Sequence, residues 1–225
     1  MIPVIIGVSF LVFFIMDLAP GDAVDILAPE GATAEDLEAI RHDLGLDQPV
    51  IVRYVKYMGG MLHGDMGVSY VSKTDVFDTY MEKLPATIKL SFASILVSIL
   101  LSVPLGIYSA TRQGTVQDNI SMIVAMIGLS MPNFWLGLLL IIVFSLNLGW
   151  FPSGGDQTLS SIVLPAITIG TGLMATLTRT TRSSMLDVLK QEYLRTARAK
   201  GIPEKIVITS HALRNALIPI ITIIG

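Results

Sequence analysis

The stretch ISMIVAMIGLSMPNFWLGLLLIIVFSLNL, residues 120–148, contains no charged side chain, and the charge-free run continues to Gly155. A helix needs about 20 mostly apolar residues to cross the hydrocarbon core of a bilayer. The alternative, a buried helix of a large soluble protein, seldom reaches this length without a polar face. The stretch therefore predicts a transmembrane helix, and we expect the chain to be an integral membrane protein.

The composition of the whole chain points the same way. Of its 225 residues, 52% are hydrophobic and 15% are charged, whereas about 25% of the residues are charged in an ordinary soluble domain. Four more apolar segments predict membrane helices, at residues 2–17, 86–110, 161–178 and 215–225. The last has about ten apolar residues, which rise about 15 Å as a helix, or half of a bilayer core. We therefore expect four full spans, a partial fifth, and a chain truncated at its C-terminus.

The charged residues are sorted by segment, and this sorting predicts the topology. Residues 18–85 hold five Lys or Arg against twelve Asp or Glu, whereas residues 179–214 hold eight against three. Because basic loops stay in the cytoplasm, we expect residues 179–214 inside, residues 18–85 outside, and the N-terminus in the cytoplasm. This arrangement requires residues 120–148 to cross once, since two crossings would put the acidic and the basic segments on the same side.

A proline lies within that single crossing. Pro132 removes one helical hydrogen bond and is expected to kink the helix. In lipid the freed backbone group needs another partner, so kinked backbone usually faces protein or a water-filled path. Ser130, Pro132, Asn133 and Trp135 are therefore candidate residues of a translocation path. A purely structural bend is an equally open interpretation.

The external segment predicts three short amphipathic helices. The first begins at an N-cap, Thr33, and ends near Gly45. The second begins at Pro49 and ends near residues 59–60, and the third covers residues 75–83. Together they form either a docking surface for an external partner or a structural lid, and the sequence leaves both open.

The basic segment ends in QEYLRTARAKGIPEKIVITSHALRNALIP, residues 191–219. It predicts a helix, a stop at Gly201, and a second helix that begins near Pro203 and continues into the next span. A basic helix-turn-helix at the membrane face suits docking to a cytosolic protein. The alternative is that its basic residues only satisfy the positive-inside bias.

This loop resembles the EAA loop of binding-protein-dependent ABC importers, in which a short coupling helix fits a groove on the ATP-binding subunit. Gly201 matches the glycine of that motif, residues 195–197 (RTA) stand where the family has Glu-Ala-Ala, and residues 213–215 (LRN) replace a Leu-Pro-Asn variant. These departures are typical of the dipeptide/oligopeptide/nickel permease branch. Further stretches similar to that branch are LAPGD at 18–22, LGLDQP at 44–49, GDMGVS at 64–69, LPAT at 84–87 and GWFP at 149–152.

The resemblance implies the all-α, polytopic helical bundle of a type I ABC importer permease. We accordingly divide the chain into a first span (1–17), an extracytoplasmic helical segment (18–85) and a permease core (86–225) with its coupling loop (179–214). The residues that the resemblance assigns to coupling with the ATP-binding subunit are Glu192, Arg195, Thr196, Ala197, Lys200, Gly201 and Ile202. The residues expected to brace the loop are His211, Leu213, Arg214 and Asn215.

The resemblance also implies the partners and the location. The expected complex contains a second permease subunit, two ATP-binding subunits and an extracytoplasmic solute-binding protein, all at the cell membrane and without nucleic acid. The expected cargo is peptides, nickel or other small solutes, moved by alternating access. Because the sequence has no Gly-x-x-x-x-Gly-Lys-Ser/Thr loop, ATP and Mg²⁺ are expected only in the partner subunits.

Two other classes of membrane protein fit the sequence less well. An ion-gradient-driven secondary transporter would favour an ionisable residue at mid-membrane, but Asp17 and Lys89 lie near the ends of their predicted spans. A membrane-embedded enzyme needs catalytic groups or metal ligands at membrane depth, and His42, His63 and His211 all lie outside the predicted spans. The absence of cysteine also excludes cysteine-ligated metals. We expect no catalytic, cofactor-binding or metal-binding residues in this chain.

Overall fold

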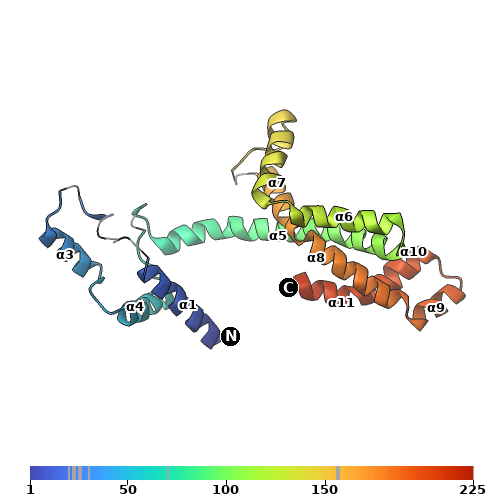
Figure 1. Ribbon diagram of the computed structural model, residues 1–225, viewed down its shortest axis with the longest axis horizontal. Coiled ribbons are helices and arrows are strands. Elements are labelled where there is room, and N and C mark those ends of the chain that lie inside the picture. The colour runs from blue at the N-terminus through green and yellow to red at the C-terminus, as the bar shows by residue number, and fades with distance from the viewer. Residues whose placement is uncertain are drawn as a thin grey trace. The chain divides into compact units, whose positions relative to one another are not determined.

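The computed structural model describes residues 1–19, 21, 24, 27–29, 31–69, 71–155 and 158–224. Within these residues almost all regular structure is helical (Figure 1), and the one β-contact is an isolated bridge between Val68 and Asp75. The all-α prediction is therefore confirmed. The chain divides into two compact units, Met1–Leu84 and Pro85–Gly225, which are described separately below.

The first unit is built on α1 (Ile2–Asp17), α3 (Ala34–Asp43) and α4 (Val50–Leu62). The predicted N-cap, Thr33, opens α3 and forms a capping box, since the backbone N–H of Asp36 donates to the Thr33 hydroxyl and the Asp36 carboxylate accepts the Thr33 N–H. The second predicted helix, α4, begins after Pro49 as expected and continues through both glycines to Leu62.

An aromatic contact holds α4 against α1. Tyr54 is buried, its hydroxyl donates to the Ile6 carbonyl at 3.2 Å and lies 2.7 Å from the Ser9 hydroxyl. The rings of Phe10 and Phe13 pack edge-on against the ring of Tyr54. Because edge-on aromatic pairs contribute beyond the area that they bury, this contact stabilises the packing of α4 on α1.

The second unit holds α8 and most of α5, the two longest helices among the described residues (Figure 1). Its elements are the part of α5 (Val76–Thr111) from Pro85 onward, α6 (Val116–Ser130), α7 (Asn133–Leu140), the π-helix η1 (Ile141–Asn147), the 3₁₀ turn η2 (Leu159–Ile162), α8 (Val163–Leu189), α9 (Glu192–Ala199), α10 (Glu204–Ile206), the π-helix η3 (Val207–Ala212) and α11 (Leu213–Ile224).

Three of these stretches are long and apolar enough to cross a membrane: Val76–Thr111, Leu159–Leu189 and Glu204–Ile224. A fourth crossing results if α6 and the helix Asn133–Asn147 count as one span, although they are bent by 99° relative to each other. The apolar helix α1 is shorter, with 16 residues.

Two prolines behave differently from their predictions. The third external helix was expected to end before Pro85, but α5 runs through Pro85 and Pro104 without interruption. At Pro132 the predicted kink is a complete break, because α6 ends at Ser130 and Met131 adopts an extended conformation with ψ 126°. A proline pushes the preceding residue out of the helical region, and at Met131 this preference is realised.

Small residues allow α5 and α8 to approach closely. A Cβ atom on Gly106 would lie 2.5 Å from the Cβ of Thr181, and one on Gly170 would lie 2.8 Å from the carbonyl oxygen of Ser94. In membranes, helices associate through such small residues because their backbones can come into van der Waals contact. This close approach positions the α5–α6 turn beside the C-terminal half of α8.

Candidate functional site

Helix α9 is amphipathic, with one face packed and the other exposed. Leu194 and Ala197 are buried, whereas the side chains of Glu192 and Arg195 are 85% and 83% exposed. Charged side chains so exposed contribute little to the stability of the fold. The outer face of α9 is therefore free to bind another molecule without loss of the fold.

The buried face of α9 belongs to an apolar cluster to which five elements contribute. Its buried members are Ala110 from α5, Met185 from α8, Leu194 and Ala197 from α9, Val207 and Ala212 from η3, and Ala216 from α11. Ile202 and Leu213 are partly buried and pack against the same cluster. We call these residues the apolar cluster. It fixes α9 to three of the long helices at once.

The predicted helix stop at Gly201 is confirmed, and its geometry is local. Gly201 has φ +77°, and its N–H donates to the Arg198 carbonyl while the Ile202 N–H donates to the Ala197 carbonyl. These two bonds form a Schellman motif, and Ile202 packs on the cluster in the apolar contact that often accompanies the motif. A Cβ on Gly201 would meet no atom within 4 Å, so glycine is needed here for its left-handed backbone and not for space.

An ion pair closes the turn after α9. The guanidinium of Arg198 donates from Nη2 to Glu204 Oε1 at 2.9 Å and from Nε to Oε2 at 3.0 Å. The hydrogen bond to Glu204 raises the pKa of Arg198 above its ordinary value. A two-bond fork restrains the relative orientation of its partners, so the pair adds a polar contact between α9 and α10.

A second polar contact ties α9 to the following helix. The amide Nδ2 of Asn215 donates to the Tyr193 hydroxyl at 2.6 Å and to the His211 carbonyl at 3.2 Å, and the Tyr193 hydroxyl donates to the same carbonyl at 3.4 Å. Of the four predicted bracing residues, Asn215 thus contributes its side chain, His211 its carbonyl and Leu213 an apolar contact, while Arg214 is exposed. Tyr193 was not predicted, because its partner lies 22 residues away.

The seven predicted coupling residues fall on two sides of the loop. Glu192, Arg195, Thr196, Lys200 and Gly201 are exposed. Ala197 belongs to the apolar cluster and Ile202 packs against it. The structure therefore places these two on the anchoring side of the loop and not on its outer face.

The four residues predicted for a translocation path are not brought into one site. Ser130 lines a pocket of about 340 Å³ with four apolar residues of the same region. Asn133 lines a different pocket, of about 480 Å³, between α7, the loop at residues 152–155 and the start of α8. Pro132 is the N-cap of α7, and Trp135 is half-exposed.

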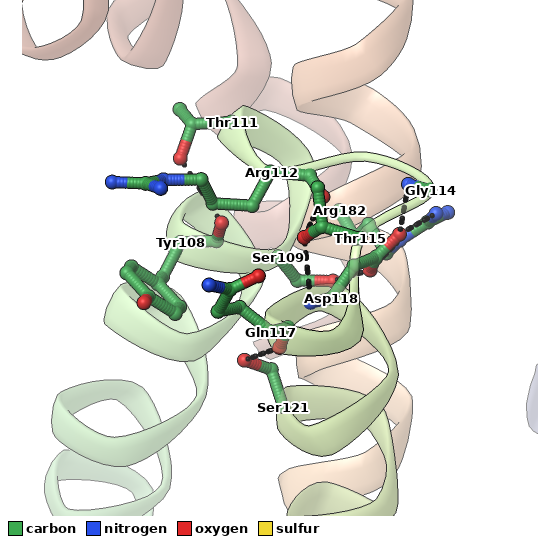
Figure 2. A network of polar contacts seen from close by, with 10 residues as sticks. All are labelled: Tyr108, Ser109, Thr111, Arg112, Gly114, Thr115, Gln117, Asp118, Ser121 and Arg182. Atoms are coloured by element: carbon green, nitrogen blue, oxygen red, sulfur yellow. Dashed lines mark hydrogen bonds and ion pairs between the residues drawn. The ribbon is translucent and has the colours of Figure 1, made fainter.

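A buried polar network joins α5, α6 and α8, and sequence reasoning missed it (Figure 2). The Asp118 carboxylate, on the first turn of α6, accepts Nε of Arg182 at 2.8 Å and Nη2 at 2.7 Å. It also accepts the backbone N–H of Gly114 at 3.0 Å and the hydroxyl of Ser109. The pattern Thr115-x-x-Asp118 is a signal for a helix start, and Thr115 does accept the Asp118 N–H. Nothing in that pattern points to Arg182, 64 residues away.

Comparison with known proteins gives a consistent result over the whole chain. The family described as binding-protein-dependent transport system inner membrane component matches residues 102–225. Its N-terminal companion, described as binding-protein-dependent transport system membrane component, N-terminal, matches residues 1–91. The oligopeptide transport system permease protein AppB of Bacillus subtilis is 44% identical, and the glutathione transport system permease protein GsiC of Escherichia coli is 39% identical. Both matches cover 100% of this chain and 74% of the relative.

Proposed function

Because this chain belongs to the family of binding-protein-dependent transport system inner membrane components, we propose that it is a permease subunit of an importer powered by ATP hydrolysis in a separate subunit. It is a multi-pass inner-membrane protein, and its relatives are permease proteins of transport systems. We propose peptides as the cargo, since the two relatives named above are permeases for oligopeptides and for glutathione. Family membership does not favour the ion-gradient-driven alternative.

The observation that carries the ATP coupling is the two-sided build of α9. Its exposed face presents Glu192, Arg195, Thr196 and Lys200 to a partner, and its buried face belongs to the apolar cluster shared with α5, α8 and α11. A partner that displaces α9 would therefore act on these long helices directly. We assign the exposed face as the docking surface for the ATP-binding subunit.

The rest of the complex we propose on the ground of the family to which the chain belongs. The loop with α9 lies in the cytoplasm, where ATP is, and the N-terminus lies on the same side. ATP and Mg²⁺ are held by two ATP-binding subunits, which act on this chain and on a second permease subunit. An extracytoplasmic solute-binding protein delivers the cargo, and the spans alternate between outward-facing and inward-facing states.

Charge reversal on α9 tests the coupling assignment. In the full complex, Arg195→Glu should lower transport-linked ATP hydrolysis about 10-fold, because like charges across an interface repel the partner. The fold should persist, because Arg195 is exposed. Among the described residues, its only ion pair is with Glu192, at a distance of 3.9 Å. The measurements are co-purification of the ATP-binding subunits and stimulated ATPase activity in proteoliposomes.

Lys73→Glu is the matched control, because Lys73 is also an exposed cation and lies in the other unit of the chain. It should leave co-purification unchanged. Wild-type levels of co-purification and of transport-linked hydrolysis in Arg195→Glu would remove α9 as the docking surface.

A further inference from the structure

The Asp118–Arg182 network lies next to the apolar cluster that anchors α9. Ser109, which donates to Asp118, directly precedes the cluster residue Ala110. Arg182 precedes the cluster residue Met185 by three positions, so both lie on one side of α8. The polar network and the apolar cluster therefore share α5 and α8, and they lie next to each other along these two helices.

The carboxylate of Asp118 is saturated with donors from three directions. Ser109 comes from the last turns of α5, Gly114 from the α5–α6 turn, and Arg182 from α8 (Figure 2). The Asp118 side chain is only 4% exposed. A bidentate guanidinium–carboxylate pair restrains both distance and orientation, so the α5–α6 turn cannot rotate on α8 without losing several of these bonds at once.

The apolar cluster alone would not impose this restraint. Its members at the contact are small or flexible side chains, such as Ala110 and Met185, and apolar contacts are non-directional. The polar network adds direction to a contact that could otherwise slide. This difference suggests a mechanical task beyond packing.

We propose that Asp118 and Arg182 are positioning residues that make the α5–α6 hairpin move together with α8 when the partner displaces α9. This inference rests on the proposed function, because it concerns how a displacement of α9 reaches the membrane-spanning helices. We call the four residues of this network the coupling joint: Asp118, Arg182, Ser109 and Gly114.

The decisive quantity is the number of solute molecules transported per ATP hydrolysed by the assembled complex. In Asp118→Asn the side chain keeps its shape and can still accept from Gly114, but it loses the charge that holds the Arg182 fork. We expect the complex to assemble and to hydrolyse ATP, while the transport ratio falls about 10-fold, within the range by which network mutations change coupling. Arg182→Lys keeps the charge without the fork and should lower the ratio less.

Two serines provide a matched pair of mild variants. Ser109→Ala removes one donor from the coupling joint and should lower the transport ratio about 2-fold. Ser121→Ala is the control, since Ser121 is also buried near the start of α6 but its hydroxyl donates to the Gln117 carbonyl of its own helix. This control should keep the wild-type ratio.

A double variant separates the connection from the charge. Asp118→Asn combined with Arg182→Gln leaves no unpaired charge and allows an amide–amide hydrogen bond between α6 and α8. If the joint acts by connecting the helices, the double variant should transport more solute per ATP than Asp118→Asn alone.

The outcomes distinguish a joint from a purely structural contact. A structural contact would reduce the amount of assembled complex and leave the transport ratio of the remaining complex at the wild-type value, which would overturn the inference. If the Asp118→Asn complex does not assemble, the test is the transport ratio of Ser109→Ala compared with that of Ser121→Ala. Equal ratios in these two variants would overturn the inference. A wild-type complex without ATP-dependent transport would instead refute the proposed function, so the two failures are distinguishable.

Discussion

Two ion pairs in the second unit have nearly the same geometry and very different surroundings. Arg182–Asp118 and Arg198–Glu204 are both two-bond forks, with shortest distances of 2.7 Å and 2.9 Å. The carboxylate is 4% exposed in the first pair and 55% exposed in the second. Geometry is therefore not what separates them. Burial decides how much each pair matters, because water can replace the partner of Glu204 but not that of Asp118.

The comparison suggests different tasks for the two regions. The network around the buried pair connects α5, α6 and α8, as a permanent connection should. The exposed pair shapes a loop whose outer face is available to a partner, and it can break at little cost. A docking loop and a transmitting joint need these opposite properties.

The strongest challenge to this comparison is to remove the same side chain from both pairs. Arg182→Met leaves the buried Asp118 carboxylate without its cation and should lower the free energy of unfolding by about 3 kcal/mol. Arg198→Met leaves a carboxylate that water can solvate, so its loss should stay below about 1 kcal/mol. Chemical unfolding of the purified protein in detergent measures both. Equal losses would show that geometry, and not burial, sets the contribution of each pair.

A bulkier residue at the α5–α8 contact should disturb only the buried pair. Gly106→Val adds a side chain whose Cβ would lie 2.5 Å from the Cβ of Thr181, and such overpacking should cost about 2 kcal/mol of unfolding free energy. The yield of disulfide cross-links between cysteines introduced in α6 and α8 should also fall in this variant. The experiment is feasible because the sequence has no native cysteine.

The matched control for this variant is Gly59→Ala in α4, where an added Cβ meets no atom within 4 Å. Alanine is the better helix former, so this change should be neutral or slightly stabilising. A stable Gly106→Val protein with unchanged α6–α8 cross-linking would contradict the close packing of α5 on α8.

A third pair extends the comparison to the surface and should have the smallest effect. The ring Nδ1 of His42 lies 2.7 Å from Asp47 Oδ2, and the histidine side chain is 78% exposed. The hydrogen bond to Asp47 raises the pKa of His42, and the same bond lowers the pKa of Asp47. The contribution of His42 is thus complete below its unfolded pKa of about 6.5 and is lost as the pH rises through its higher folded pKa.

Titration of the His42 ring by NMR measures this pair directly. In Asp47→Asn the pKa of His42 should fall toward its ordinary value, with no measurable change in the unfolding midpoint. A His42 pKa that does not respond to Asp47→Asn would mean that the contact is absent in solution.

The features that were predictable from the sequence are local ones. The helix stop at Gly201 depends on a motif of six consecutive residues. The cap of α3 depends on Thr33 and Asp36, which are three residues apart. The membrane helices were visible as long apolar stretches, although Pro85 was wrongly expected to end a helix that continues through it. Proline position alone does not decide whether a helix breaks, because packing around it also counts.

The features that could not be predicted depend on residues far apart in the chain. Asp118 meets Arg182 across 64 residues, and Tyr193 meets Asn215 across 22. Arg182 was counted only as one of eight basic residues of the loop, which is correct for charge bias but says nothing about a buried partner. Patterns of residues that are close together in the sequence carry no information on which helices pack against each other.

The π-helix η3, Val207–Ala212, changes the direction in which the side chains of the following helix, α11, point around the helix axis. A π-turn holds about one residue more than an α-turn, so residues beyond it are rotated by about 100° relative to an uninterrupted α-helix. Ala216 and Ile220 are the buried positions of α11. A helical wheel drawn continuously from Glu204 would assign these residues to the wrong face, so any choice of labelling sites on α11 has to restart its count at Leu213.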